Sequence, residues 1–461
     1  MSRVLLIYPY FRPKHDRSIF RFPPLGLGYV AAELRDARHE VSLLDCTFRT
    51  RQEALEKAAK TRADVVGIYS MVSMKEASLW FARELGRRVR LLIAGGPLPT
   101  CDPLPFLDDF DVVVRGEGER AVREIINARE AGRDFADIPG IVFRENHHGR
   151  IEIESDGSEN PVFTGQRELI ADLNGVPFPA RELFPNRAYI AYWKRKFGYA
   201  TTTVFTTRGC PFSCEFCSNA VFGISYRERS PESVVDEVEQ ALSLGYDHIH
   251  FADDVFTLNK VRVARICLEI MRRKLSFTWE CLGRVDSIDA ELARTMKAAG
   301  CRRIFFGLES GNDSILRLMN KKITVEKARL AVRAARQAGI TVGAFFILCY
   351  PGETDDTVLD TIRFATSLTA DYLSFTVPYP LPGTPLYERV GGKMTKEWKQ
   401  PDGLLSDHVL TFQSEFSEAK MRFGIVKGQI QFWLSKRGGS AGGVLLRPFE
   451  KVTDLAFKLM K

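Results

Sequence analysis

Three cysteines, Cys210, Cys214 and Cys217, stand close together in one short segment of the chain. A cubane [4Fe–4S] cluster takes one thiolate per iron, and no fourth cysteine lies nearby. Three thiolates would therefore leave one iron open to bind another molecule. Gly209 and Pro211 fit a tight turn, so the thiolates fall on one short loop that can wrap a face of a cluster.

Two simpler uses of these cysteines agree less well with the sequence. A structural zinc site needs a fourth Cys or His ligand, but the nearest histidines, His248 and His250, lie in a strand-like run more than thirty residues further on. A disulfide framework is disfavoured because the chain shows no signal peptide and the other cysteines have no framework spacing. We expect those others to be buried apolar residues: Cys46, Cys101, Cys267, Cys281, Cys301 and Cys349.

The segment resembles the hallmark motif of the radical S-adenosylmethionine (radical SAM) superfamily, which is C-x3-C-x2-C with an aromatic residue, here Phe216, before the last cysteine. The resemblance implies that the open iron binds SAM through its amino and carboxylate groups. It also implies that an electron from the cluster cleaves a carbon–sulfur bond of SAM, and that the resulting 5′-deoxyadenosyl radical removes hydrogen from an inert C–H bond. A low-potential electron donor such as a flavodoxin or ferredoxin is then an implied partner.

Four positions are expected to contact SAM. Phe216 is one, and the others follow later strands. Asp253 and Asp254 can be read as helix-capping acids, but the resemblance places the SAM amino group here, and we assign it to Asp254. Arg284 forms either a structural ion pair or a bidentate contact with the SAM carboxylate. Glu309 lies in the run Phe-Phe-Gly-Leu-Glu-Ser-Gly, which matches the family's fourth-strand motif, and its carboxylate needs a polar group such as the ribose hydroxyls.

The composition is that of an ordinary soluble protein with several domains, since 461 residues are 45% hydrophobic and 27% charged. The apolar runs are too short for a membrane span. The N-terminus begins like a strand rather than a targeting peptide, so we expect a cytoplasmic location. Lys and Arg are dispersed among acids, and the net charge of +7 gives no reason to expect nucleic acid as a partner.

The N-terminal part alternates short apolar strands with helical patterns. That alternation predicts an α/β fold with a doubly wound parallel sheet, whose ligands bind at the carboxyl ends of the strands. The predicted strands are 4–8, 40–44, 65–70, 90–94 and 111–114, and 75–88 is a predicted helix.

A dinucleotide is the first ligand to consider for such a sheet, but the loop after the first strand lacks G-x-G-x-x-G, and Asp45 alone is more typical of a turn. The segments 23–34, 95–97 and 114–119 instead resemble the Rossmann-like cobalamin-binding domain that precedes the radical SAM barrel in one subfamily. The cobalamin contacts that the resemblance implies are Pro9, Ser70, Gly95, Gly96, Gly116 and Glu117.

One feature of many cobalamin domains is missing. They carry D-x-H-x-x-G, whose histidine binds cobalt, and neither His15 nor His39 stands in that context. We therefore expect no histidine ligand on the lower face of the cobalt.

Four regions are predicted. Residues 1–130 form the cobalamin-binding domain, and 131–198 form a linker in which 141–144 and 150–153 make a β-hairpin. Residues 199–390 form a partial (β/α)6 barrel with its active residues at the strand ends. Its predicted strands are 201–207, 247–252, 277–282, 302–308, 340–348 and 371–377, and 233–244 and 325–338 are predicted helices.

Residues 391–461 are predicted to be a mainly helical C-terminal tail. Residues 414–434 read as an amphipathic helix, which typically packs on a domain. A smaller class of such helices lies on membranes, so a peripheral membrane contact and a hydrophobic small-molecule substrate stay open.

The combined pattern predicts a cobalamin-dependent radical SAM enzyme, and specifically a C-methyltransferase that uses a 5′-deoxyadenosyl radical and methylcobalamin to methylate an unactivated carbon. The alternative is a cyclase or other bond-forming enzyme with the same three cofactors, the [4Fe–4S] cluster, SAM and cobalamin. A methylthiotransferase is less consistent, because that branch needs three more cysteines in its N-terminal domain and only Cys46 and Cys101 occur here. A corrinoid or cluster sensor without turnover is the non-enzymatic alternative.

Overall fold

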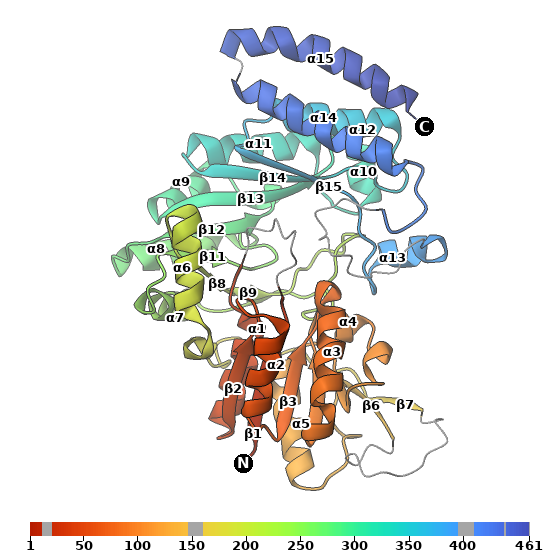
Figure 1. Cartoon of the computed structure of the whole chain (residues 1–461). Coiled ribbons are helices and arrows are strands. Elements are labelled where there is room, and N and C mark those ends of the chain that lie inside the picture. The colour runs from red at the N-terminus through yellow and green to blue at the C-terminus, as the bar shows by residue number, and fades with distance from the viewer. Residues whose placement is uncertain (12–20, 146–159, 395–409, 438, 461) are drawn as a thin grey trace.

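Two sheets organise the chain, a mostly parallel one in its N-terminal part and a parallel one in its middle (Figure 1). The structure is a computed structural model and describes residues 1–461 except 12–20, 146–159, 395–409, 438 and 461. A pair of long helices lies at the end of the molecule farthest from the N-terminal sheet.

The N-terminal sheet has seven strands in the order β2-β1-β3-β4-β5-β6-β7, and the first five run parallel. Its elements are β1 (Arg3–Tyr8), α1 (Leu25–Asp36), β2 (Glu40–Asp45), α2 (Arg51–Lys60), β3 (Val65–Tyr69), α3 (Lys75–Leu85), β4 (Leu91–Gly95), α4 (Pro97–Cys101), β5 (Val112–Val114), α5 (Gly118–Glu130), β6 (Ile141–Arg144) and β7 (Pro161–Phe163).

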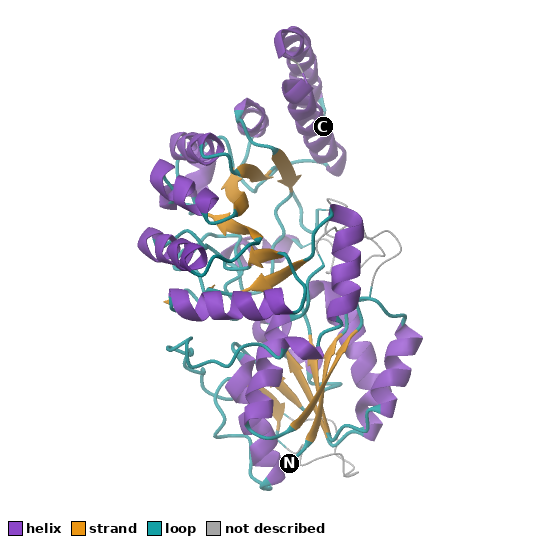
Figure 2. Cartoon of the chain, turned by 90° about the vertical axis from the view of Figure 1, so that its left-hand side faces the viewer, coloured by secondary structure: helices purple, strands orange, loops and turns teal. Residues whose placement is uncertain are grey.

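Helices cover both faces of this sheet (Figure 2). Along β1, Val4 and Leu6 pack into one hydrophobic cluster with α1 and α5, whereas Leu5 and Ile7 pack into another with α3. Successive side chains of a strand point to opposite faces, so a strand apolar at every position is buried on both sides. The predicted doubly wound sheet is confirmed.

Residues 141–144 form a strand as expected, but this strand pairs with other strands than the predicted one. β6 pairs antiparallel with β5 and with β7, so it extends the N-terminal sheet beyond residue 130. The expected partner, 150–153, lies outside the described residues. The apolar and β-branched run Ile141 to Phe143 indicated a strand but carried no information about which strand it would join.

The second sheet has six parallel strands in the order β8-β11-β12-β13-β14-β15 and stays open between its two edge strands. The linker helix α6 (Asn186–Phe197) leads into it. Its elements are β8 (Thr201–Val204), α7 (Pro231–Ser243), β11 (His248–Phe251), α8 (Lys260–Arg272), β12 (Thr278–Gly283), α9 (Ala290–Ala298), β13 (Cys301–Glu309), α10 (Asp313–Leu318), α11 (Val325–Gln337), β14 (Thr341–Ile347), α12 (Asp355–Ser367), β15 (Tyr372–Thr376) and α13 (Pro385–Val390). The predicted partial (β/α)6 barrel is confirmed.

Alternation along the barrel strands decides which side chains face inward. On β13, Ile304, Phe306 and Leu308 belong to the hydrophobic core under the helices. The residues between them therefore point to the inner face, and Glu309 ends that series at the carboxyl end of the strand. The barrel thus presents polar groups at its mouth while its outer face is apolar.

Two helices follow the barrel, α14 (Glu418–Arg437) and α15 (Gly439–Leu459). α14 packs on α12 and β15, and Gly428 lets it approach closely, because a Cβ there would lie 2.7 Å from the ring of Phe375. A helix that packs on the barrel is present where one was predicted, but it runs from Glu418 to Arg437 and not over 414–434. No helix among the described residues has the length and apolar character needed to span a membrane.

Candidate active site

The loop that carries the three cysteines is closed at its base by a short two-stranded ribbon. β9 (Thr207–Arg208) leads into the loop, β10 (Arg227–Glu228) leads out, and the two pair antiparallel with Arg208 opposite Arg227. Gly209 has a φ of +83°, and a Cβ there would lie 2.5 Å from the carbonyl oxygen of Ser225. Glycine therefore makes the sharp turn into the cysteine segment possible.

Other barrel loops hold the cysteine loop from outside. Asn320 donates hydrogen bonds from Nδ2 to the carbonyl and hydroxyl oxygens of Ser213, at 2.7 and 3.0 Å. Tyr350 donates its hydroxyl to Oε2 of Glu215 at 2.6 Å, and Arg389 pairs with the other oxygen of that carboxylate at 3.1 Å. Arg389, which lies in α13, thus supports the cysteine loop from the C-terminal end of the barrel.

All three cysteine side chains are free thiols, with Cys210 and Cys214 buried and Cys217 exposed. Burial raises the pKa of Cys210, and the nearby Asp254 carboxylate and Cys214 thiol raise it further. The protein alone thus disfavours a thiolate there, and a bound iron cation would supply the missing positive charge. No three His, Cys, Asp or Glu side chains of the described residues converge on one metal-ion position. A cubane does not require that, because each thiolate binds a different iron, and the assignment of a cluster to this trio stays a prediction.

The neighbouring acids Asp253 and Asp254 have different roles. Asp253 is buried and accepts hydrogen bonds from the backbone N–H groups of Thr206 and Thr207, at 2.6 and 3.0 Å. It therefore holds the strand that leads into the cysteine loop. Asp254 is exposed and has no hydrogen bond to another described residue, while its charge acts on Cys210. The position of Asp254 suits the predicted contact with the SAM amino group, which stays a prediction.

Glu309 has a partner that sequence reasoning missed. Nζ of Lys321 lies 2.8 Å from Oε1 of Glu309, and both side chains are largely buried. Glu309 has a φ of +63°, an uncommon conformation for a residue with a side chain. Lys321 also lies over the ring of Phe216 at 5.7 Å, which joins this ion pair to the cysteine loop. No sequence signal singled out Lys321, because its neighbours in the chain are also polar.

The other two predicted SAM contacts lie beside the same loop. Phe216 is half-buried and meets the ring of Tyr350 edge-on. The guanidinium of Arg284 stacks on Phe212 at 3.6 Å, pairs with Asp286 at 2.9 Å and donates to the carbonyl oxygen of Lys321 at 2.6 Å. These contacts favour the structural ion pair that the sequence left open, and a contact of Arg284 with SAM stays a prediction.

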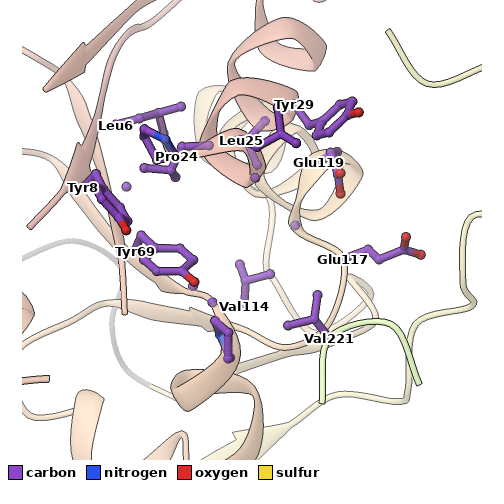
Figure 3. Close-up of a pocket in the computed structure, with 18 of the residues that line it drawn as sticks. Leu6, Tyr8, Pro24, Leu25, Tyr29, Tyr69, Val114, Glu117, Glu119 and Val221 are labelled. Carbon is purple, nitrogen blue, oxygen red and sulfur yellow. The ribbon is translucent and has the colours of Figure 1, made fainter. Parts of the chain in front are cut away.

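A cavity of about 470 Å³ lies where the N-terminal sheet meets the barrel. Its walls come from the carboxyl ends of β1, β3, β4 and β5, from α1, and from the barrel residues Thr203, Phe205, Arg208 and Ala252. Figure 3 shows Leu6, Tyr8 and Tyr69 on one side and Glu117 and Glu119 on the other. Binding cavities of this kind are mostly apolar with a few placed polar groups.

Four of the six predicted cobalamin contacts line this cavity: Gly95, Gly96, Gly116 and Glu117. Gly96 has a φ of +117°, and a Cβ there would lie 2.5 Å from the carbonyl oxygen of Ser70. The glycine thus allows the strand end to turn away and leave the cavity open. This cradle and the apolar wall fit the insertion of part of a corrinoid.

The other two predicted contacts, Pro9 and Ser70, are not among the lining residues. Ser70 is fully buried behind Gly96, and its hydroxyl has no hydrogen-bond partner in the described structure. The cavity lining that the structure describes contains no histidine. His39 lies elsewhere, where Nδ1 accepts a hydrogen bond from the backbone N–H of Ser2, and His15 is outside the described residues. The expected absence of a histidine ligand stays a prediction.

Glu117 does more than line the cavity. Its carboxylate pairs with Arg208 at 2.7 Å and with Arg227 at 2.8 Å, and Glu119 pairs with Arg208 at 2.6 Å. Two arginines at the base of the cysteine loop therefore meet two carboxylates from the wall of the cavity. Sequence reasoning named Glu117 but gave no sign of these partners, which come from a region about a hundred residues away.

Comparisons with known proteins agree with this division of the chain. Residues 204–365 match the radical SAM superfamily, and residues 18–126 match the B12 binding domain. An uncharacterized methyltransferase of Pyrococcus horikoshii is 35% identical over 399 residues, which cover 84% of this chain and 83% of the relative.

Two further proteins extend the comparison. The anaerobic magnesium-protoporphyrin IX monomethyl ester cyclase of Rubrivivax gelatinosus is 28% identical over 404 residues, covering 85% of this chain and 70% of the cyclase. Among solved structures, the radical SAM methyltransferase TsrM of Kitasatospora setae, with cobalamin and a [4Fe–4S] cluster bound, aligns with a TM-score of 0.69 at 23% identity. The alignment covers 85% of this chain and 75% of that one. This likeness establishes the fold.

Proposed function

Because the chain belongs to the radical SAM superfamily and carries a B12 binding domain ahead of the barrel, we propose that it is a cobalamin-dependent radical SAM enzyme that methylates an unactivated carbon. One observation carries this proposal. The cavity of the N-terminal domain and the cysteine loop of the barrel adjoin, since Arg208 lines the cavity and stands two residues before Cys210. A substrate between them would face both sites at once.

When bound, the cluster with SAM supplies a carbon radical and cobalamin supplies a methyl group. The residues of the chain bind and orient these groups. Cys210, Cys214 and Cys217 hold the irons, and Asp254 accepts hydrogen bonds from the SAM amino group. Glu309, held by Lys321, accepts hydrogen bonds from the ribose hydroxyls.

The apolar wall of the cavity binds the corrinoid and keeps water away from the reacting carbon. Tyr8 and Tyr69 belong to this wall, and burial raises the pKa of Tyr69 to about 12. The pKa of Tyr8 is raised as well. Both phenols therefore stay neutral at physiological pH. A neutral wall suits the amide-bearing edge of a corrinoid better than a charged one would.

The test uses the protein as purified without oxygen and reconstituted with iron, sulfide and hydroxocobalamin. It is reduced and incubated with SAM that carries a deuterated methyl group and with a metabolite extract from a strain that lacks the gene. Methylation predicts 5′-deoxyadenosine together with a product that has gained the labelled methyl group. Failure to form 5′-deoxyadenosine would contradict the enzymatic proposal and favour a sensor.

A cyclase or other bond-forming enzyme is the second candidate, and the likeness to the Rubrivivax gelatinosus cyclase favours it. The same incubation separates the two. A cyclase would give a product that has lost hydrogens and contains no deuterium.

The partners follow from the same chemistry. The substrate is a small molecule that would bind between the cavity and the cysteine loop. A low-potential flavodoxin or ferredoxin would deliver the electron, and a reducing cytoplasm would keep the exposed Cys217 free for iron.

We also propose that the α14–α15 pair touches an anionic lipid surface. The hairpin surface, defined as the exposed side chains Val426, Ile430, Trp433, Val452, Leu455 and Leu459, forms one apolar stripe on each helix. Residues 418–459 contain eight Lys and Arg but three Asp and Glu. Of these acids, Glu450 and Asp454 point inward to Arg363, at 3.1 and 2.6 Å. Lys420 and Lys427 are buried, and Lys458 pairs with Asp356. The exposed side chains of the pair are nevertheless apolar and basic, as in interfacial helices, because Arg422, Lys436, Arg447 and Lys451 are exposed.

A further inference from the structure

One carboxylate of the N-terminal domain binds both ends of the cysteine loop. Oε1 of Glu117 lies 2.7 Å from Nη1 of Arg208, on the strand that enters the loop. Oε2 of Glu117 lies 2.8 Å from Nη1 of Arg227, on the strand that leaves it. Because Arg208 and Arg227 are direct partners across the β9–β10 ribbon, Glu117 bridges the ribbon at the point where the loop begins and ends.

These charges are removed from water. The Glu117 side chain is 1% exposed and that of Arg208 is 4% exposed. With Glu119 as a second partner for Arg208, two arginines meet two carboxylates, and the group is neutral overall. Removal of one partner from a buried pair leaves a charge uncompensated, which is strongly unfavourable. The arginines therefore have little freedom to move apart from Glu117.

Glu117 is also fixed from the side of the cavity. It directly precedes α5, it stands between the cavity-lining residues Gly116 and Gly118, and it accepts a hydrogen bond from the backbone N–H of Ile170 at 2.8 Å. A ligand that contacts 116–119 therefore contacts the segment whose carboxylate holds the loop. The same short segment belongs to both sites.

We propose that Glu117 is a positioning residue that couples the corrinoid cavity to the iron–sulfur loop. This inference rests on the proposed function, since it requires both groups to bind. Occupation of the cavity fixes 116–119, which fixes Arg208 and Arg227 and so narrows the conformations of the loop between them. Because coupling between two binding sites is reciprocal, an assembled cluster strengthens corrinoid binding by the same factor.

The experiment measures this coupling on the full chain. Protein reconstituted with iron and sulfide under anaerobic conditions is mixed with an excess of an iron chelator, with and without hydroxocobalamin, and protein-bound iron is followed over time. The readout is the rate of iron loss without hydroxocobalamin divided by the rate with it. Glu117→Gln removes the charge and keeps the shape. Glu124→Gln is the matched control, because Glu124 lies on α5, the helix that Glu117 directly precedes, and pairs with Arg167.

In the unaltered protein, hydroxocobalamin is expected to slow iron loss by about fivefold if a coupling at the lower end of the usual range is expressed in the rate at which iron leaves. Glu117→Gln should bring the ratio close to one, and Glu124→Gln should leave it unchanged. Should Glu117→Gln not fold, Arg227→Gln frees only the strand that leaves the loop and should lower the ratio in part.

If Glu117→Gln and Arg227→Gln both keep the ratio of the unaltered protein, the proposal is overturned. The corrinoid would then protect the iron merely by covering it. A ratio of one in the unaltered protein, with iron and hydroxocobalamin both bound, would also overturn it while leaving the proposed function intact. Failure to bind either group would contradict the proposed function itself.

Discussion

Nζ of Lys321 lies 2.8 Å from Oε1 of Glu309, at the mouth of the barrel and beside the cysteine loop. The pair joins the end of β13 to the loop that follows α10. A Cβ on Gly307 would lie 3.1 Å from the same Nζ, so the strand is shaped to admit the lysine. Lys321, which no sequence motif indicated, thus neutralises Glu309, which lies in a recognised motif.

Replacement of Lys321 by methionine should destabilise the protein by about 2 kcal/mol, less than a fully buried pair would lose, because both side chains keep some exposure. The expected change is a melting midpoint lower by about 4–8 °C, measured by thermal denaturation. The double variant Lys321→Met/Glu309→Gln should recover part of this loss, since no charge is left unpaired. Equal melting of the single variant and the unaltered protein would contradict the argument.

Each of the variants Cys210→Ala, Cys214→Ala and Cys217→Ala should lose most of the iron of the reconstituted protein. The unaltered protein should hold about four irons. Cys267→Ala is the control, because Cys267 is buried in the barrel core and belongs to α8. Iron and sulfide analysis after desalting gives the answer, and full iron content in all three loop variants would refute the cluster site.

Gly96→Ala should weaken binding of hydroxocobalamin by about tenfold or more, because a left-handed backbone and a Cβ 2.5 Å from the Ser70 carbonyl force the cavity wall to shift. Gly165→Ala serves as the control, since nothing lies within 4 Å of a Cβ there and the residue is outside the cavity. Equilibrium dialysis measures both affinities. The iron content should not change, and an unaltered affinity of Gly96→Ala would argue against this cavity as the corrinoid site.

A buried acid should make stability depend on pH. Burial raises the pKa of Glu353 to about 8 from an ordinary value of 4.5. Between these two values the folded state binds more protons than the unfolded state, so stability falls as pH rises from 4.5 to 8 and the full penalty is present above 8. The expected penalty is on the order of a few kcal/mol.

The variant Glu353→Gln tests this pH dependence, because the amide keeps an oxygen that can accept from the backbone N–H of Tyr350. Melting midpoints of the two proteins should converge near pH 5 and separate by pH 8.5, with the variant more stable. Parallel curves over this range would show that Glu353 does not titrate as described.

The hairpin surface should bind vesicles that contain phosphatidylglycerol and bind phosphatidylcholine vesicles much less, and added salt should weaken the binding. Trp433→Ser with Leu455→Ser should reduce co-sedimentation several-fold. Val261→Ser is the control, because Val261 is exposed on α8 of the barrel and not on the C-terminal helices. Absence of binding to either vesicle, or dimerisation through this surface in its place, would contradict the proposal.

Much of this molecule could be predicted from local patterns. Alternation of apolar strands with helices indicated both α/β units. Spacing indicated Cys210, Cys214 and Cys217 as cluster ligands, which stays a prediction. Period and spacing are properties of neighbouring residues, which the chain states directly. The family that these patterns resembled is the family to which the chain belongs.

The partners of charged residues were decided by the tertiary structure. Asp253 and Asp254 are neighbours of the same type, yet only the fold buries the first, where it accepts hydrogen bonds from Thr206, and leaves the second exposed. Glu117 meets Arg208 and Arg227, and Glu309 meets Lys321, because separate elements converge in space. The strength of an ion pair depends on the distance between the charges and on the exclusion of water. Local sequence patterns give neither quantity for residues that are far apart in the chain.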